Sequence, residues 1–308
     1  MAVIEVEGLR KEYRSRRGRT VAVDGLDLLV PEGGVFAFLG PNGAGKTTTI
    51  RCLLGLVRST GGRCRLLGAD TPKDLATIIR RVGSIVETPT LFSRFSGRRN
   101  LELLGQLHGI GRTAVSDALE RVGLADRADH LVKTYSLGMR QRLGIGAALL
   151  KDPEVLILDE PANGLDPAGI KEVRELLRRL GDQGRTIFVS SHILTEVQHT
   201  ADRVAILSRG TCVASGPVGE VLAAGRSAGL IVRVDDMAGG LEALRSAGIP
   251  ASSDDHVIRV MLPPEEAATV TRTLADRGLY LTELRPDEVD LETVFLELTR
   301  ETPKEASP

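Results

Sequence analysis

The 308-residue sequence predicts an α/β protein built on a buried, partly parallel β-sheet. Three observations support this fold class. Short apolar runs such as residues 35–39 and 155–158 contain no polar residue, which is typical of strands buried on both faces of a parallel sheet. Each run is followed by a chemically distinctive segment, a glycine-rich loop or a pair of carboxylates. Residues 88–150, in contrast, have a mostly helical pattern, with amphipathic helices predicted at residues 100–107, 114–122 and 140–150, which indicates a helical insertion in the α/β core.

The composition excludes several classes of protein. With 40 basic and 41 acidic residues the formal net charge is −1, so the overall basic character of a nucleic-acid-binding protein is missing. The three cysteines are scattered without a C-x-x-C pair, which argues against a disulfide framework and a zinc site. No apolar stretch approaches the roughly 18 residues of a membrane span, and the N-terminus alternates like a strand rather than a signal peptide.

A glycine-rich loop lies between the apolar run at residues 35–39 and a helical pattern at residues 48–54. It has the form G-x-x-x-x-G-K-T and consists of Gly40, Pro41, Asn42, Gly43, Ala44, Gly45, Lys46 and Thr47. Glycines let the backbone approach phosphate oxygens, and the following helix adds its positive end. Lys46 can then reach the outer phosphates, the Thr47 hydroxyl can bind Mg²⁺, and Thr48 completes the predicted binding residues. The strand–loop–helix context disfavours the alternative, a glycine-rich turn without function.

Two carboxylates, Asp159 and Glu160, end the strand predicted at residues 154–158. Ligands gather at the carboxyl ends of parallel strands, so both side chains should lie beside the nucleotide. Because neighbouring residues of a strand point in opposite directions, the two should have different roles. Asp159 is suited to hold Mg²⁺, directly or through water, and Glu160 to orient or deprotonate the attacking water. The competing interpretation is an acidic cap of the strand end.

Two further residues are candidates by position. His192 ends the apolar run at residues 186–192, on the sheet edge predicted for Asp159. A lone histidine is more often structural, but this place favours a contact with the γ-phosphate. Tyr13 ends an early strand, and position alone leaves open whether it stacks on a base or is an ordinary edge-strand aromatic. The basic stretch at residues 14–19 indicates a solvated hairpin tip.

The pattern divides the chain into two parts. Residues 1–224 form the nucleotide-binding domain, with a helical subdomain at about 88–150. Residues 225–229 are a glycine-containing linker, residues 230–300 alternate between strand and helix patterns, and residues 301–308 are a frayed tail. We therefore expect a small accessory α+β domain at the C-terminus, in which we find no catalytic constellation.

The segment Tyr135-Ser136-Leu137-Gly138-Met139-Arg140-Gln141 resembles the signature motif of ABC-transporter ATPases, whose usual form is Leu-Ser-Gly-Gly-Gln. The resemblance covers about residues 3–223. It implies a P-loop NTPase fold of the ABC ATPase type, with a RecA-like core of mixed sheet, an antiparallel β-subdomain and a helical insertion. The small C-terminal α+β domain would be added to that fold.

The resemblance also implies a role for each candidate. Residues 40–47 match Walker A, Asp159 with the run before it matches Walker B, and Glu160 matches the catalytic glutamate. His192 matches the switch histidine, and Tyr13 matches the adenine-stacking aromatic. Asn163 to Asp166 match the D-loop, and Ser136 with Gly138 match the signature residues that bind the γ-phosphate.

Three residues depart from the usual family pattern. The signature has Leu137 and Met139 where Gly and Gln are usual, and Glu87 stands where the Q-loop normally has Gln. As a carboxylate, Glu87 would be a charged Mg²⁺ ligand that donates no hydrogen bond. These features are similar to the exporter ATPases of bacitracin-resistance and lantibiotic-immunity systems, and residues 292–298 resemble the end of drug-export ATPases.

The family's mechanism implies partners that the chain itself does not contain. A single Walker A and a single signature imply that two copies pack head to tail, with ATP and Mg²⁺ between the Walker A of one copy and the signature of the other. Separate integral membrane permease subunits would hold the pair at the cytoplasmic face of the membrane. No nucleic-acid partner is expected.

Several alternatives stay open at this point. A soluble ABC ATPase of DNA repair or translation would carry a long coiled coil or two ATPase domains, and this chain shows neither pattern. An ABC ATPase that regulates a membrane sensor or resistance complex without transport is compatible with every motif. A P-loop GTPase is disfavoured because no Asn-Lys-x-Asp motif occurs.

Overall fold

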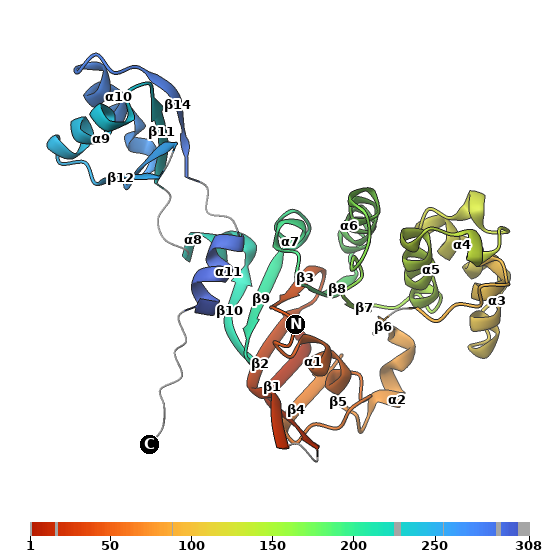
Figure 1. Ribbon diagram of the computed structural model, residues 1–308. Coiled ribbons are helices and arrows are strands. Elements are labelled where there is room, and N and C mark those ends of the chain that lie inside the picture. Colours follow the sequence, from red (N-terminus) through yellow and green to blue (C-terminus); the bar gives the residue numbers. More distant parts are fainter. Residues whose placement is uncertain are drawn as a thin grey trace. The chain divides into compact units, whose positions relative to one another are not determined.

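The computed structural model describes residues 2–15, 18–87, 89–224, 229–254, 256–287 and 291–300. They fall into two compact units, residues 2–218 and residues 219–300, which are described separately (Figure 1). Most of the linker expected at residues 225–229, and all of the tail expected at 301–308, lie outside the described residues. Within the described residues, no helix combines the length and apolar character that crossing a bilayer requires.

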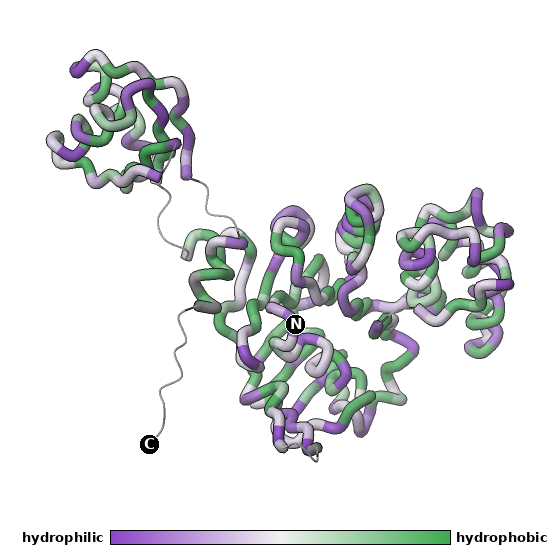
Figure 2. Tube along the Cα trace, viewed as in Figure 1, coloured by the Kyte–Doolittle hydropathy of each residue, from purple (hydrophilic) through white to green (hydrophobic). Residues whose placement is uncertain are grey.

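A six-stranded sheet forms the centre of the first unit, in the order β10-β9-β3-β8-β7-β6. Its strands are β3 (Gly34–Leu39), β6 (Val82–Ile85), β7 (Val155–Asp159), β8 (Thr186–Ser191), β9 (Arg203–Ser208) and β10 (Thr211–Pro217). All neighbours are parallel except β10, which runs antiparallel to β9. Every residue of β7 and β8 is buried, as their apolar runs predict. In Figure 2 the tube along these strands is coloured mainly as hydrophobic.

Helices cover both faces of this sheet. α1 (Lys46–Leu53) contacts β7 and also β4 of a second sheet, so it lies between the two sheets. α6 (Pro167–Asp182) and α7 (Leu194–Thr200) pack on the other face, against β3 and β8. Alternate side chains of β3 accordingly face the two sides, with Phe36 in the core beneath α1 and Val35 toward α6.

The second sheet is antiparallel, with the order β2-β1-β4-β5. Its strands are β1 (Ala2–Ser15), β2 (Gly18–Pro31), β4 (Gly61–Leu66) and β5 (Ala69–Thr71). The sequence pattern predicts three short strands here, at residues 3–7, 20–23 and 26–30. That number is wrong, because β1 and β2 are long strands that continue through register shifts. Gly8 and Gly25 lie at positive φ, 53° and 70°, which lets the backbone bulge without ending the ladder.

The helical segment contains α3 (Gly97–Leu107), α4 (Arg112–Arg121) and α5 (Leu137–Leu149). A short α2 (Leu75–Ile78) precedes β6. Two of these helices begin three residues earlier than the apolar pattern predicts, at 97 and 137 instead of 100 and 140. The reason is an N-cap: the Ser96 hydroxyl accepts a hydrogen bond from the Arg99 N–H, and Ser136 does the same for Met139. The predicted α/β fold with a helical insertion is thus confirmed.

The second unit contains a β-α-β-β-α-β arrangement of the ferredoxin-like type. Its elements are β11 (Leu230–Val234), α9 (Met237–Ser246), β12 (Ala251–Asp254), β13 (Val257–Val260), α10 (Ala267–Ala275) and β14 (Leu281–Pro286). The sheet order is β12-β13-β11-β14, and a separate apolar core joins it to the two helices. The sequence did not predict β12, since this edge strand has three polar residues among four. Helices α8 (Val218–Ala224) and α11 (Leu291–Arg300) flank the arrangement in the chain.

Candidate functional site

The segments that follow β3, β7 and β8 meet at the carboxyl edge of the six-stranded sheet. β8 lies between β3 and β7, and all three run parallel. The loop after β3, Glu160 after β7 and His192 after β8 therefore come together. They line a cavity of about 360 Å³, whose walls are Ala22, Pro41, Asn42, Gly43, Ala44, Gly45, Lys46, Thr47, Thr48, Glu160, Asn163 and His192.

The glycine-rich loop has a backbone that requires glycine at three positions. Gly43 and Gly45 have φ values of 82° and 108°. A Cβ on Gly45 would lie 2.5 Å from the carbonyl oxygen of Ala22, and one on Gly40 would lie 2.8 Å from that of Leu207. The loop thus curls closely against its neighbours and ends at the N-terminus of α1. Such a turn presents backbone N–H groups and a positive helix end to an anion.

Lys46 provides the positive charge at the mouth of this loop. Its ammonium group donates a 2.6 Å hydrogen bond to the Gly40 carbonyl, and only 5% of the residue is exposed. The Nζ atom also lies 3.2 Å from Oε1 of Glu160. The other carboxylate oxygen, Oε2, lies 2.7 Å from Nδ1 of His192. Glu160 therefore bridges Lys46 and His192, two groups that are both suited to contact a phosphate.

Asp159 lies one residue before Glu160 and is 6% exposed. Its Oδ1 accepts a 2.5 Å hydrogen bond from the Ser190 hydroxyl, and it is not among the residues that line the cavity. Within the described residues there is no group of three or more His, Cys, Asp and Glu side chains that could hold a metal. One carboxylate and the Thr47 hydroxyl still fit Mg²⁺, which proteins usually bind through one or two carboxylates together with substrate phosphates and water.

Glu87 lies after β6 and outside the lining of the cavity. It has a positive φ of 69°, and its carboxylate pairs with the guanidinium of Arg51 on α1. The predicted Q-loop residue is thus joined to the helix that begins at the glycine-rich loop. About 66% of its side chain is exposed.

Tyr13 lies near the end of β1, with 39% of its surface exposed and no place in the cavity lining. The Nζ atom of Lys11 lies 4.9 Å from the centre of the Tyr13 ring. Glu12, between these two residues, is 8% exposed and accepts hydrogen bonds from Arg10 and Arg19. These bonds from Arg10 and Arg19 to Glu12 hold the strand segment that carries the Tyr13 ring.

Of the predicted signature and D-loop residues, Asn163 lines the cavity, whereas Ser136, Gly138 and Asp166 lie at the N-termini of α5 and α6, outside the lining. Ser136 caps α5, and Asp166 caps α6 by accepting a 3.1 Å hydrogen bond from the Gly169 N–H. A Cβ on Gly138 would lie 3.6 Å from Cα of Gly169, so the two helix starts pack closely. The structure thus brings the Walker residues and His192 together, and it brings Ser136, Gly138 and Asp166 together in a second place.

Sequence reasoning missed three residues of the site. Ala22 and Asn163 line the cavity, and Ser190 bonds to Asp159. The chain pattern offered no indication for Ala22, which comes from β2 of the other sheet. Asn163 was named only as part of the D-loop match. Ser190 is one of three polar residues in the fully buried strand β8, so the sequence did not distinguish it.

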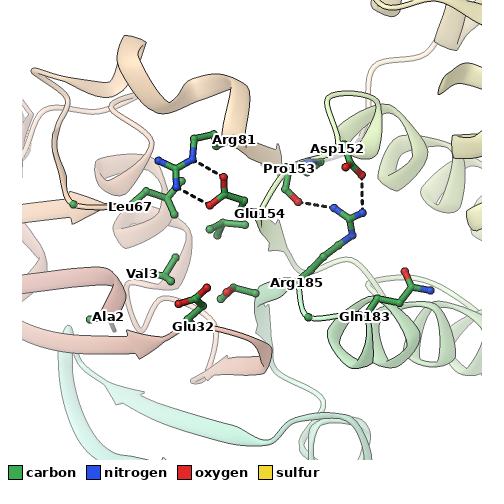
Figure 3. Close-up of a pocket in the computed structure, with 14 residues that line it drawn as sticks. Ala2, Val3, Glu32, Leu67, Arg81, Asp152, Pro153, Glu154, Gln183 and Arg185 are labelled. Atoms are coloured by element: carbon green, nitrogen blue, oxygen red, sulfur yellow. Dashed lines mark hydrogen bonds and ion pairs between the residues drawn. The ribbon is translucent and has the colours of Figure 1, made fainter.

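A second cavity, of about 400 Å³, lies at the amino ends of β7 and β8, the opposite edge of the sheet (Figure 3). Two ion pairs cross its walls: Arg81 binds Glu154 at 2.6 Å, and Arg185 binds Asp152 at 2.7 Å. The hydrogen bond from Arg81 lowers the pKa of Glu154, and the hydrogen bond from Arg185 lowers the pKa of Asp152. These arginines are already neutralised, so we assign them the structural role of joining neighbouring strands.

Comparison with known proteins agrees with this geometry. A family model described as ABC transporter matches residues 23–163. The bacitracin transport ATP-binding protein BcrA of Enterococcus faecalis is 38% identical over 302 residues, which cover 96% of each chain. The daunorubicin/doxorubicin resistance ATP-binding protein DrrA of Streptomyces peucetius is 36% identical over 96% of this chain and 92% of its own.

Among solved structures, cbiO1 of Clostridium perfringens, described as part of the ABC transporter complex cbiONQ, is similar with a TM-score of 0.64 and 30% identity. That match covers 72% of this chain and 91% of cbiO1. Members of this family bind and hydrolyse ATP as the ATP-binding subunits of transporters. The chain, with its glycine-rich loop, its Asp159–Glu160 pair and two relatives matched over nearly their whole length, belongs to the ABC transporter ATP-binding family.

Proposed function

We propose that this chain is the ATP-hydrolysing subunit of an exporter for antibiotic peptides or other drugs, and that it acts as a head-to-tail dimer. The observation that supports it most is the meeting of Lys46, Glu160 and His192 at the mouth of the glycine-rich loop. The names of the relatives BcrA and DrrA support the substrate class. Both align over almost the full length, including the C-terminal unit.

ATP binding would use the loop and the first turn of α1. Backbone N–H groups of residues 41–48 would hold the β- and γ-phosphates, and the Lys46 ammonium would neutralise their charge. Tyr13 would stack on the adenine from the β1–β2 hairpin. In the present geometry the Glu160 carboxylate contacts both Lys46 and His192. We expect the γ-phosphate of ATP to replace this carboxylate as the partner of both residues.

Mg²⁺ would be held by Thr47 and Asp159, and when bound it neutralises charge on the β- and γ-phosphates. Glu87 completes the predicted metal residues, although its carboxylate pairs with Arg51 in this structure. Released from Lys46, Glu160 would accept the proton of the attacking water, and His192 would orient the γ-phosphate. Loop N–H groups and Lys46 would stabilise the charge of the transition state.

The dimer follows from the separate place of the signature residues. Ser136, Gly138 and Asp166 lie outside the cavity of their own chain. A helix N-terminus such as that of α5 binds anions, so the signature of one copy would close over the ATP held by the other. Closing and reopening of this pair would drive a membrane permease, with the ATPase at the cytoplasmic face.

Substitution of Glu160 by Gln tests the catalytic assignment. An amide cannot accept the proton of water, so we expect kcat to fall by about 10²- to 10⁴-fold. ATP binding should persist, and size-exclusion chromatography with Mg²⁺ and ATP should show a stable dimer. Glu154→Gln, at the exposed start of the same strand, is the matched control and should keep the wild-type rate. Wild-type turnover by Glu160→Gln would remove Glu160 from this role.

The export assignment is tested in cells. Expression together with a candidate permease should lower the intracellular concentration of a bacitracin-like peptide or an anthracycline. The Glu160→Gln chain should abolish that effect at an equal protein level. Resistance that persists while the drug concentration inside the cell stays unchanged would instead indicate a non-transporting resistance complex.

A further inference from the structure

Ser190 is a buried hydroxyl between the two carboxylate residues of the site. It lies in β8 directly opposite Asp159 of β7, and none of its surface is exposed. Its Oγ donates a 2.5 Å hydrogen bond to Oδ1 of Asp159 and accepts a 2.9 Å hydrogen bond from the backbone N–H of Glu160. One hydroxyl therefore donates a hydrogen bond to Asp159 and accepts one from Glu160.

The two hydrogen bonds orient the Asp159 carboxylate and satisfy the backbone N–H of Glu160. Ser190 supplies its single proton to Asp159, which fixes one carboxylate oxygen and leaves the other available to a metal or water. Its lone pair satisfies the N–H of Glu160, a residue with φ of 48°. A residue other than glycine is strained in this left-handed region, so the conformation needs support from its surroundings.

That backbone conformation determines where the Glu160 carboxylate lies. From it the side chain reaches Lys46 and His192, at 3.2 Å and 2.7 Å. Without the Ser190 acceptor the Glu160 N–H would lose its hydrogen bond, and the strain could relax by turning the chain after β7. The carboxylate would then leave the position from which it can meet the γ-phosphate and water.

We propose that Ser190 is a positioning residue that sets both the Asp159 carboxylate and the Glu160 backbone for ATP hydrolysis. This inference rests on the function proposed above. A buried serine with a purely structural role would need only to fill space and satisfy its own hydroxyl. Ser190 instead bonds to the two residues assigned to metal binding and water activation, so its loss should change chemistry more than folding.

The test compares Ser190→Ala with Ser190→Thr, which keeps the hydroxyl, in the full-length protein. Ser208→Ala, at another buried serine in β9, is the matched control. Steady-state kinetics give kcat and KM for ATP. Electron paramagnetic resonance of Mn²⁺ titrated into the ADP-bound protein gives metal affinity without turnover. Should Ser190→Ala fail to fold, Ser190→Cys, similar in size and a weak donor, takes its place.

We expect Ser190→Ala to lower kcat by about 10- to 100-fold and to weaken Mn²⁺ binding, as loss of a group that orients a metal ligand typically does. The KM for ATP should stay within about twofold, because Lys46 and the loop are untouched. Ser190→Thr should recover most of the rate, and Ser208→Ala should match the wild type in every measurement.

Three results would overturn the inference. Ser190→Ala could keep both kcat and Mn²⁺ affinity, Ser208→Ala could lose as much, or a folded Ser190→Thr could behave like the alanine variant. Failure of the proposed function gives a different pattern. The wild-type protein would then show no Mg²⁺-dependent ATP hydrolysis, or the Glu160→Gln variant would hydrolyse ATP at the wild-type rate. In that case the Mn²⁺ titration still decides whether Ser190 orients Asp159.

Discussion

Glu12 shows how one buried carboxylate organises the surface where a base is expected to bind. It is paired with Arg19 and Arg10, and its neighbour Tyr13 is the proposed stacking residue. The hydrogen bond from Arg19 is the largest cause that lowers the pKa of Glu12, from 4.5 to about 2. Because the folded pKa lies below the unfolded one, Glu12 stabilises the fold above pH 4.5, and this contribution is lost as the pH falls toward 2.

Glu12→Gln should therefore lower the urea midpoint of unfolding at pH 7, while the difference from the wild type shrinks as the pH falls from about 4.5 to about 2. It should also weaken binding of a fluorescent ATP analogue, since the hairpin that presents Tyr13 loses its ion pairs. Glu7→Gln, on the same strand but 56% exposed, is the control and should change little. A pH-independent difference between Glu12→Gln and the wild type would contradict the pKa assignment.

The residues of the site were predictable to different degrees. Lys46, Glu160 and His192 follow buried apolar runs, and the carboxyl ends of parallel strands meet at one sheet edge. Ser190 could not be predicted, because its role depends on the register that places it opposite Asp159. The pairing of Glu87 with Arg51 was equally hidden, since it joins two elements far apart in the sequence.

The loop after β6 connects the site to the helical segment, and Glu87 is its contact with α1. Both side chains of the Glu87–Arg51 pair are partly exposed, so the pair contributes at most about 1 kcal/mol to stability. We propose a conformational role: the pair joins the helix that carries Lys46 to the loop expected to contact a permease.

Glu87→Gln should leave ATP affinity unchanged and weaken drug resistance in cells that express the permease. The amide keeps the size of the side chain but loses the charge that Arg51 binds. Arg51→Gln removes the same pair from the other side and serves as the matched variant, with the same direction of change expected. If resistance and ATPase rate both stayed at wild-type values for Glu87→Gln, the coupling role would be excluded.

Element boundaries were harder to predict than the elements themselves. α3 and α5 begin at serine caps, Ser96 and Ser136, that lie before the apolar pattern starts. β1 and β2 continue through bulges where shorter strands were expected. α7 was not predicted, because it is only seven residues long. For α3, α5, β1 and β2 a local hydrogen bond or a glycine, and not hydrophobic periodicity, sets the boundary.

Across the whole molecule, the residues assigned to ATP are divided between two places. The cavity at the carboxyl edge holds residues 41–48, Glu160 and His192, whereas Ser136 and Gly138 lie at the start of α5. The family resemblance predicted this division and the dimer that would complete it. The small C-terminal unit has its own core, and we propose it as an accessory domain.

The most direct test of the shared site is a disulfide cross-link between two single-cysteine variants, made in a chain whose native Cys52, Cys64 and Cys212 are replaced by alanine. Asn42→Cys places a thiol at the exposed glycine-rich loop, and Ser136→Cys places one at the signature. The two chains are mixed in the Glu160→Gln background and oxidised with Mg²⁺ and ATP, and the products are separated on a non-reducing gel. ADP, or added Lys46→Ala, serves as the control.

We expect an ATP-dependent band at twice the chain mass, which contains one copy of each variant and disappears with ADP. A head-to-tail pair requires this result, since the loop of one copy then faces the signature of the other. A chain that carries both cysteines and forms its ATP-dependent disulfide only within itself would contradict the shared site.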